Sequence, residues 1–458
     1  MSHLIEYIKM FGRFQRNARL YLVSNALSGI TMGALLVLYN LYLVELGYRT
    51  DFIGLVLFVS TIGAGLAIFP AGICVDRFGG KPILIWSSVL IGIAGAGQIL
   101  FRTPIPLLVS GFVAGIGAAF VLVVNAPFLT ENSTPAERPH LFSLNIVVSL
   151  ATSVLGEFIG GSLPLWLRST PWLMEPLPHW LAWTLVSAPE PRSYQLALLA
   201  AGIIATPSFV PLFMLKEARR ARPEPIQLAS LPRLDKQGLL NNVNRWRQII
   251  SGPIFVMIVI QALIGLGAGM LIPYFNVYFV RQLGASPALF GAIDGGANTL
   301  NACLTLLAPW LATRIGKVNT ITVTRLISIP LLLIIGLSHD LPLAATLYLF
   351  RMGAMDMSQG IFQVFSMEVA EKKHRGLANS SYQVAGQVSR AIVAPLAGFI
   401  IASLGFAPVF IIGAAFYLLA IAGLWGWYKI NWSKREDQKL AEDELASRIP
   451  EAIPADKQ

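Results

Sequence analysis

Long apolar runs are the feature that most constrains the fold of this chain. Each run covers about 20 residues or more, which at about 1.5 Å per helical residue spans the roughly 30 Å hydrocarbon core of a bilayer. Of the 458 residues, 55% are hydrophobic and only 13% are charged, so polar residues are too few to cover several soluble domains. We therefore predict an all-α membrane protein, because a helix in lipid satisfies its own backbone hydrogen bonds.

Twelve such runs are bounded by charged residues, proline or glycine, and each predicts a transmembrane helix. This pattern indicates a multi-pass protein of the cell membrane, whose first partner is the lipid bilayer itself. The predicted spans cover residues 20–46, 52–75, 82–101, 105–129, 141–166, 194–215, 251–280, 288–312, 319–337, 343–369, 377–403 and 406–429.

Lysine and arginine residues indicate which ends of these spans face the cytoplasm. Of the 34 basic residues, 26 lie in the tails and connections of one face, five on the opposite face and three within spans. Basic residues gather on the cytoplasmic side of membrane proteins, so we predict that both termini are cytoplasmic. Topology thus explains the net charge of +10, and we expect no nucleic acid partner.

A basic segment divides the predicted spans into two groups of six. We predict an N-terminal six-helix bundle over residues 1–215 and a C-terminal six-helix bundle over 251–430. The connection between them, 216–250, contains eight basic residues and is predicted to be a cytoplasmic linker. Residues 431–458 form a charged cytoplasmic tail.

The two groups of spans repeat one pattern of landmark residues. The same offset of 237 residues relates charged and glycine positions throughout both groups, which indicates that a six-helix unit is present twice. The matching landmarks are Arg77 and Gly79 with Arg314 and Gly316, Gly54 with Gly291, and Glu131 and Arg138 with Glu368 and Arg375.

A charged segment, GICVDRFGGKP, joins the second and third predicted spans. It has the pattern G-x-x-x-D-R-x-G-x-K, carried by Gly72, Asp76, Arg77, Gly79 and Lys81. Together with two six-span bundles, cytoplasmic termini and a basic central linker, this pattern resembles the major facilitator superfamily. The resemblance covers essentially the whole chain and implies twelve helices in two bundles related by a pseudo-twofold axis.

The resemblance also implies that the charged segment helps to hold the cytoplasmic side shut. Gly79 allows a tight turn with positive φ, and Arg77 and Lys81 offer donors to carboxylates, with Glu131 as an expected partner. The alternative is that the basic residues only enforce orientation. We group the residues expected to form this cytoplasmic gate as Gly72, Asp76, Arg77, Gly79, Lys81, Glu131, Arg138, Arg314, Gly316, Glu368 and Arg375. The second copy is expected to be weaker, because Thr313 replaces the aspartate.

Polar side chains recur at helical spacing inside four predicted spans. Such residues are costly in lipid and usually face a cavity or a partner. The resemblance implies the same division, because it places the third, sixth, ninth and twelfth helices at the periphery. Arg325 on span 9 is an exception that we expect to reach toward the cytoplasmic surface. The candidate proton-coupling or substrate residues are Asn145 and Glu157 on span 5, Asp294, Asn298 and Asn301 on span 8, Arg351 and Asp356 on span 10, and Gln383, Gln387 and Arg390 on span 11.

Depth along the spans suggests which charges meet. Asp356 and Arg390 each lie about 13 residues, or about 20 Å, from a span end, and we predict that they form an ion pair near the midplane. By the same estimate Glu157, Asp294 and Arg351 lie in the outer half of the membrane.

Glu157 lies in a sequence that resembles an element of proton-coupled exporters in this superfamily. Their fifth span carries G-P-x-x-G-G, whereas Leu155 to Gly161 reads LGEFIGG, so the glycines match and Glu157 replaces the proline. The substitution weakens the exporter assignment but places a titratable group at that position. A structural carboxyl group, hydrogen-bonded between helices, is the alternative.

Two asparagines and two tyrosines recur at the predicted outer ends of spans 1 and 7. They are Asn40 and Tyr42 in the first unit and Asn276 and Tyr278 in the second. These residues either line the external mouth or place aromatic side chains at the membrane interface, and the sequence favours neither.

These observations predict a secondary transporter that moves a small organic solute by alternating access. We expect proton coupling through Glu157, Asp294 or Asp356, with export, as in an efflux antiporter, favoured over uptake. The alternatives are an uncoupled facilitator, an organic-anion uptake carrier that uses Arg351 and Arg390, and a non-transporting membrane sensor or scaffold. The sequence does not identify the substrate.

The remaining residue patterns argue against other classes of protein. No phosphate-binding G-x-x-x-x-G-K-[ST] motif is present, and neither the two cysteines nor the five histidines form a metal-binding pattern. We therefore expect no enzyme activity, no cofactor and no metal, and a monomer with a small-molecule substrate and protons as its partners.

Overall fold

The computed structural model describes residues 14–134, 137–176, 178, 184–216, 252–369 and 375–431, and these residues form helices without strands. The first group comprises α2 (Arg16–Glu45), α3 (Thr50–Phe78), α4 (Gly80–Leu100), α5 (Pro104–Glu131), α6 (Arg138–Arg168), α7 (Pro171–Met174), α8 (Pro189–Ala205), η1 (Thr206–Ser208) and α9 (Phe209–Phe213). The second comprises α11 (Pro253–Leu271), η3 (Ile272–Tyr274), α12 (Phe275–Val277), η4 (Tyr278–Gln282), α13 (Pro287–Ile315), α14 (Lys317–Leu337), α15 (Leu341–Asp356), α16 (Gln359–Val369), α17 (Arg375–Leu404) and α18 (Ala407–Asn431).

The predicted twelve spans correspond to twelve helical segments. Within the described residues, ten helices are long and apolar enough to cross a membrane. The other two are α13, whose polar side chains lower its hydropathy, and the predicted span 343–369, which is interrupted between Asp356 and Gln359. The two least apolar spans are therefore among those with the predicted polar faces.

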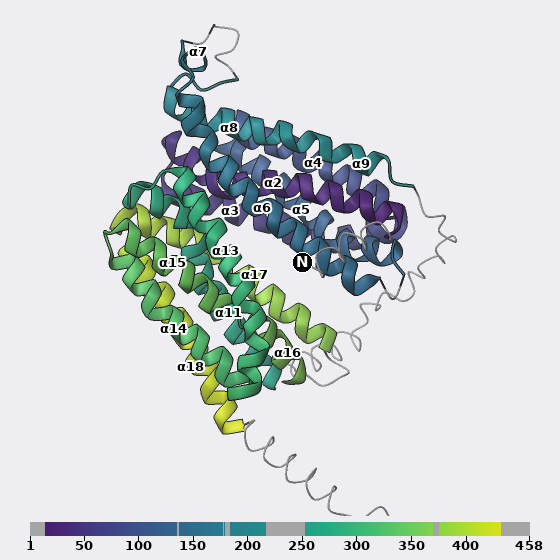
Figure 1. Ribbon diagram of the computed structural model, residues 1–458, viewed down its shortest axis with the longest axis vertical. Helices are drawn as coiled ribbons and strands as arrows, with labels where there is room; N and C mark the ends of the chain where they lie inside the picture. The colour runs from purple at the N-terminus through teal and green to yellow at the C-terminus, as the bar shows by residue number, and fades with distance from the viewer. Residues whose placement is uncertain are drawn as a thin grey trace, which may run out of the picture.

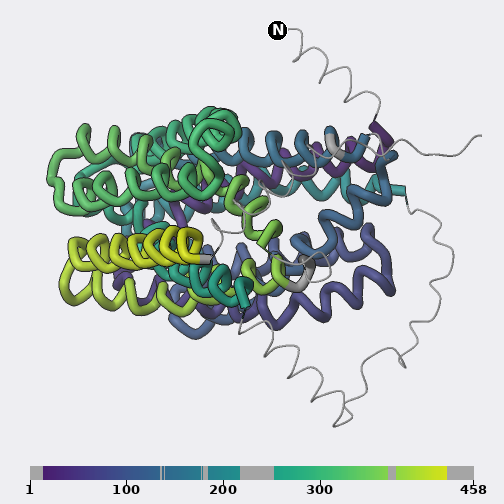
Figure 2. The backbone as a smooth tube through the Cα atoms, turned by 90° about the horizontal axis from the view of Figure 1, so that it is seen from below, coloured from purple at the N-terminus to yellow at the C-terminus, as the bar shows by residue number. Residues whose placement is uncertain are grey.

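The helices form two halves, α2 to α9 and α11 to α18, that lie side by side (Figure 1). Seen from below, the helices of both halves project along one direction (Figure 2), whereas in Figure 1 the helices of the two halves are inclined to each other. The halves converge at the end where α13 begins and diverge toward the opposite end (Figure 1). The boundaries 1–215 and 251–430 stay predictions, because 217–251 and 432–458 lie outside the described residues.

Close backbone contacts at glycine positions join the two halves. A Cβ atom added to Gly54 of α3 would lie 2.5 Å from the carbonyl oxygen of Ala394 on α17. A Cβ atom added to Gly291 of α13 would lie 2.3 Å from the carbonyl oxygen of Glu157 on α6. Both pairs are related by the predicted offset of 237 residues, so the repeat in the sequence is also a twofold relation in space.

A second set of glycine contacts obeys the same relation. Gly398 approaches the carbonyl oxygen of Thr50, and Gly161 approaches that of Pro287, with added Cβ atoms at 2.2 and 2.4 Å. The α3–α17 and α6–α13 contacts are thus two copies of one arrangement.

Reciprocal hydrogen bonds reinforce this end of the molecule. Asn40 Nδ2 donates to the carbonyl oxygen of Pro273 at 2.6 Å, and Asn276 Nδ2 donates to that of Val37 at 3.1 Å. The offset is 236 residues for both partners, as expected from the one-residue insertion in the second unit. These asparagines therefore join the two halves, a role that neither sequence interpretation included.

The repeated tyrosines act within each half. Tyr42 donates to the carbonyl oxygen of Ile99 at 2.8 Å, and Tyr278 donates to that of Ile335 at 2.5 Å. Both hydroxyl groups are thus buried donors that tie the first helix of each half to its third.

Substitution of Gly54 tests the close contact between the halves. We expect Gly54→Ala to lower the free energy of unfolding by about 1–3 kcal/mol, because its methyl group overlaps backbone atoms of α17. Gly65→Ala on the same helix is the matched control, since no heavy atom lies within 4 Å of its added Cβ. Thermal unfolding of the two purified variants in detergent makes the comparison, and equal unfolding midpoints would contradict the contact.

Cysteine labelling tests the predicted orientation in a background with Cys74 and Cys303 replaced by serine. Ala188 and Thr134 are both exposed and lie at opposite ends of the helices. We expect an impermeant maleimide to label Ala188→Cys in intact cells, and to label Thr134→Cys only after the membrane is permeabilised. The reverse pattern would overturn the assignment of both termini to the cytoplasm.

Candidate functional site

Hydrogen bonds and an ion pair close one end of the space between the halves. Thr50 Oγ1 donates to the carbonyl oxygen of Gly398 at 2.7 Å, and the Tyr274 hydroxyl group donates to the carbonyl oxygen of Thr50 at 3.5 Å. Arg281 and Glu45 form an ion pair at 2.8 Å across the same end. By the charge distribution in the sequence, this closed end is the predicted external one.

The predicted gate residues lie at the opposite end, at helix ends that are joined by the one-residue turns Gly79 and Gly316 rather than by a charged loop. α3 continues through Asp76 and Arg77 to Phe78, and α4 begins at Gly80. Gly79 has a φ of +88°, so the predicted positive φ is confirmed. Gly316 repeats this turn between α13 and α14 with a φ of +83°.

The gate residues of both halves have the following surroundings. Arg77 is exposed, with its guanidinium over the Phe78 ring. Gly72 and Lys81 are half-buried, and Asp76 and Glu131 are exposed.

The other gate residues make contacts within their own half. Arg138 donates to the carbonyl oxygen of Thr130 at 3.3 Å. Arg314 lies over the Trp310 ring, and Lys317 pairs with Glu368. The side chain of Arg375 lies outside the described residues, and closure by this set stays a prediction.

Glu157 is buried at the α6–α13 contact, with 1% of its surface exposed. Its Oε1 accepts a hydrogen bond from Ser153 at 3.3 Å, whereas Oε2 is buried without a hydrogen-bond partner. Oε2 lies 3.6 Å from a Cβ atom built at Gly295 of α13. The carboxyl group therefore faces the other half of the molecule at close range.

Asp294 brings a second carboxyl group to this contact from the second half. Tyr348 on α15 donates its hydroxyl to Asp294 Oδ1 at 2.6 Å. Asp294 and Asn298 both interact with the Glu157 carboxyl group. Two candidate residues from different halves, far apart in the sequence, are thus brought together where the halves meet.

A buried aromatic and cationic cluster continues from Tyr348 into the second half. The Tyr348 ring packs against Phe275 at 4.8 Å between centroids. The Arg351 guanidinium lies between the rings of Phe275 and Tyr417, at 5.7 and 5.6 Å, and donates to the Tyr417 hydroxyl at 3.3 Å. Two aromatic faces thus offset part of the cost of burying this cation.

The predicted ion pair between Asp356 and Arg390 is wrong. Both residues are described, yet no nitrogen–oxygen distance between them is within 4.0 Å. Asp356 interacts most strongly with Arg351, followed by Arg325 and Arg390. Equal depth does not make two residues neighbours, because the rotation of each helix about its axis also decides which side chains meet.

Arg325 corrects a second expectation. It is 2% exposed, donates to Gln359 Oε1 at 3.0 Å and lies 4.9 Å from the centre of the Phe362 ring. The interruption between α15 and α16 brings Gln359 beside it, so Arg325 does not extend to the surface. Arg325 and Tyr417 belong to α14 and α18, spans 9 and 12, which therefore contribute to the buried cluster as well as forming the periphery.

The remaining candidates divide into a structural pair and exposed side chains. Asn145 is buried and accepts a hydrogen bond from Asn25 Nδ2 at 2.8 Å, which ties α2 to α6. Asn301 is half-buried and accepts a hydrogen bond from Thr305. Gln383, Gln387 and Arg390 are exposed and lie on the face of α17 that carries Ala394, which is the face directed toward the other half.

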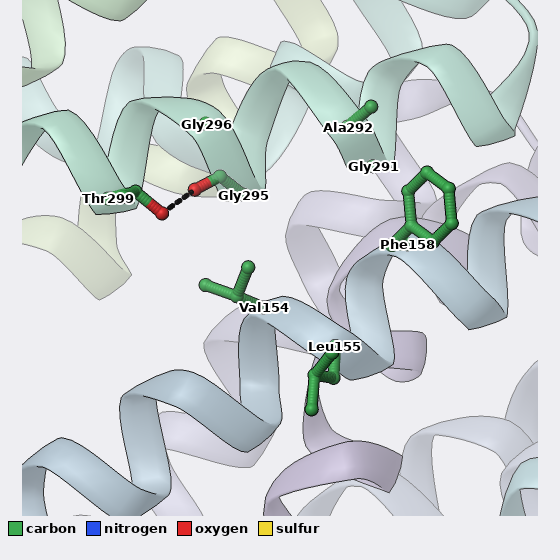
Figure 3. Close-up of a pocket in the computed structure, with 8 residues that line it drawn as sticks. All are labelled: Val154, Leu155, Phe158, Gly291, Ala292, Gly295, Gly296 and Thr299. Atoms are coloured by element: carbon green, nitrogen blue, oxygen red, sulfur yellow. Dashed lines mark hydrogen bonds between the residues drawn. The ribbon is translucent and has the colours of Figure 1, made fainter.

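A separate pocket of about 290 Å³ lies between α6 and α13 (Figure 3). Phe158 and Leu155, more than half exposed, contribute from α6, and Thr299 donates to the carbonyl oxygen of Gly295 on α13 at 2.8 Å. Glu157 does not line it. The lining is nearly all apolar, so this pocket suits an apolar group rather than a charged one. It is lined by Val154, Leu155, Phe158, Gly291, Ala292, Gly295, Gly296 and Thr299.

Sequence reasoning missed the tyrosines of the site. Tyr348 and Tyr417 are single polar residues within apolar runs, so they add to no periodic polar face. Their position inside predicted spans was nevertheless a usable signal, because a buried tyrosine hydroxyl usually finds a hydrogen-bond partner.

The chain is similar in sequence to known membrane transport proteins. The chain matches the family model of the Major Facilitator Superfamily over residues 21–393 and 257–454. Multidrug resistance protein MdtH of Yersinia enterocolitica serotype O:8 is 26% identical over 141 residues, which are 31% of this chain and 32% of that protein. The match to MdtH of Yersinia pestis has the same extent, so the chain spans about a third of the length of these relatives.

Solved structures of transporters share the fold at low identity. A bacterial homologue of the lysosomal transporter Spinster, inward-facing and occupied, gives a TM-score of 0.68 at 14% identity, over 89% of this chain and 95% of that one. The nucleoside transporter NupG gives 0.68 at 14% identity, over 91% and 100%. A bacterial homologue of the iron transporter ferroportin, inward-facing, gives 0.67 at 17% identity, over 90% and 98%.

Removal of the Tyr348 hydroxyl tests the hydrogen bond to Asp294. We expect Tyr348→Phe to destabilise the protein by about 1–3 kcal/mol, because it leaves a buried acceptor without its donor. Tyr382→Phe is the matched control, since the Tyr382 hydroxyl is buried without a partner. Thermal unfolding separates the two variants, and a loss of the same size in Tyr382→Phe would show that the hydrogen bond is unimportant.

Proposed function

Because the chain belongs to the Major Facilitator Superfamily, we propose that it is a secondary transporter that exports a small organic solute in exchange for protons. Transport proceeds by alternating access, in which the two halves rock about a site near the middle of the bilayer. The protein resides in the cell membrane with both termini in the cytoplasm and acts as a monomer.

The observation that carries the proposal is the pair of carboxyl groups where the halves meet, buried Glu157 and half-buried Asp294. Ionisable residues at membrane depth are expensive, and they mark ion or proton pathways more often than packing sites. Each carboxyl group of this pair also affects the ionisation of the other, because a nearby negative charge disfavours the ionised form. Asp356, among three arginines, is the third candidate for coupling.

The arrangement of the halves supports an inward-facing state. The hydrogen bonds and ion pair that join described residues of both halves lie at the predicted external end, as do Asn40 and Asn276. The polar side chains of α17 beyond this contact are exposed. In this state the solute would enter from the cytoplasm, as an exporter requires.

Similarity to other proteins supports export as the direction of transport. The MdtH proteins are called multidrug resistance proteins, and the region similar to them is about a third of this chain. The glycines Gly156, Gly160 and Gly161, shared with the exporter element, provide close packing of α6 on α2 and α13. Export is therefore the direction that we propose.

An organic-anion carrier is the second candidate. Arg390 is exposed beside Gln383 and Gln387, a combination that can bind a carboxylate through a charge-assisted hydrogen bond. The buried Arg351 and Arg325 add positive potential behind it. An anionic solute would favour this candidate whichever direction it moves.

Transport in proteoliposomes tests proton coupling. A thermal-shift screen of the purified protein against drug and metabolite libraries first supplies a solute, because a ligand that binds the folded state stabilises it. We expect a pH gradient to drive movement of that solute in the wild type, and Glu157→Gln to abolish the effect of the gradient. Glu190→Gln, at an exposed carboxyl group, is the control, and full gradient-driven transport by Glu157→Gln would exclude Glu157 from coupling.

A further inference from the structure

The two symmetry-related contacts between the halves differ in the side chains at two equivalent positions. At the offset of 237 residues, Glu157 of the α6–α13 contact corresponds to Ala394 of the α3–α17 contact. At the same offset, Asp294 corresponds to Leu57. One contact therefore carries two carboxyl groups where its symmetry mate carries two apolar side chains.

Packing does not require these carboxyl groups. The α3–α17 contact brings its backbones together as closely as the α6–α13 contact, with an added Cβ at 2.5 Å compared with 2.3 Å. The α3–α17 contact, which has no carboxyl group at the equivalent positions, closes the same end of the molecule together with the hydrogen bonds of Thr50 and Tyr274. Since burying a carboxyl group is costly, the symmetry mate serves as an internal control that argues for a chemical role.

The groups that face Glu157 come from each element packed around it. Asp294 and Asn298 face it from α13, Ser153 faces it from its own helix, and Tyr348 from α15 interacts with it, with Arg351 behind Tyr348. On α2, the contacts with α6 at Gly156 and Gly160 are made by Ile30 and Ala34, which carry no charge. The like charge of Asp294 is thus the dominant one at the contact.

We propose that Glu157 and Asp294 form one proton-binding site shared by the two halves, and that a proton held there keeps the external end closed. The inference rests on the proposed function, which it deepens by naming the state that holds the proton. Two ionised carboxylates facing each other in a low-dielectric contact repel, whereas a pair that shares one proton does not. Tyr348 already donates to Asp294, so the proton belongs to Glu157, whose Oε2 has no partner.

This site gives the transport cycle its direction. A proton that enters from outside closes the external end and yields the inward-facing state. Release of that proton to the cytoplasm leaves two facing carboxylates, whose repulsion favours separation of α6 from α13 at the external end. A solute that binds from the cytoplasm is then carried outward, so one proton enters for each opening of the external end.

Labelling of a cysteine placed at a buried position measures how often the external end opens. Val37 is fully buried there and its carbonyl oxygen accepts from Asn276, so Val37→Cys, in the Cys74→Ser and Cys303→Ser background, reacts with external impermeant maleimide only when the end opens. Because thiol reactivity itself rises with pH, each rate is divided by that of exposed Ala188→Cys. We expect this ratio to rise between pH 5.5 and pH 8, by at most about tenfold per pH unit for one linked proton.

Two variants test the shared site. The double variant Glu157→Ala with Asp294→Leu copies the apolar symmetry mate and should give a low ratio that is independent of pH. Glu157→Gln, which mimics the protonated group, should do the same if the double variant fails to fold. Glu45→Gln breaks the ion pair with Arg281 at the same end and should raise the ratio at every pH while its pH dependence is kept.

The outcomes separate this inference from the proposed function. A pH-dependent ratio in the wild type that is lost in the carboxyl variants supports the shared site. A ratio in the wild type that does not change with pH, or one that keeps its pH dependence in both carboxyl variants, overturns it. If solute transport still follows the pH gradient in that case, the proposed function stands without it, whereas pH-dependent labelling without gradient-driven transport removes the proposed function alone.

Discussion

The close approach of helix backbones at Gly54 and Gly291 is the constraint on which the rest of this structure depends. Without a side chain at these positions, α3 meets α17 and α6 meets α13 at backbone distance, and in lipid such packing replaces the hydrophobic effect as the force between helices. The same approach brings the main chain of Glu157 onto α13. The position of its carboxyl group against the second half is therefore a consequence of the glycine contact, not a separate feature.

The buried arginines of the second half contact aromatic rings and an amide group in addition to interacting with the Asp356 carboxyl group. Arg351 lies between two aromatic rings, and Arg325 combines a ring with the amide of Gln359. An arginine stays charged at any physiological pH, so these contacts are permanent. Carboxyl groups can change their charge, which makes the Glu157–Asp294 pair, rather than the arginine cluster, the part of the site able to switch between two states.

Sequence patterns predicted the features that depend only on the position of a residue along the chain. Hydropathy gave the spans, the constant offset gave the twofold relation, and Gly79 gave the turn with positive φ. The pairing of Asp356 with Arg390 failed because depth says nothing about rotation of a helix about its axis. Arg325 was predicted to extend to the surface because the apolar run 343–369 was interpreted as one continuous span, although it is interrupted between Asp356 and Gln359. The partner of Asp294 was missed because a single tyrosine has no period.

The chemical difference between two symmetric contacts also indicates how the halves move. The α3–α17 contact has Leu57 and Ala394 at the equivalent positions, so no carboxyl group there makes its energy depend on pH. In the proposed cycle, the α6–α13 contact is the one that gains and loses a proton. In the proposed cycle, rocking about the site near the middle of the bilayer separates both contacts at the external end, and loss of the proton from the α6–α13 contact favours this separation. With identical side chains at positions 157 and 394 and at 294 and 57, both contacts or neither would respond to a proton, so in the proposed cycle the divergence at positions 157 and 294 makes one of two symmetric contacts sensitive to pH.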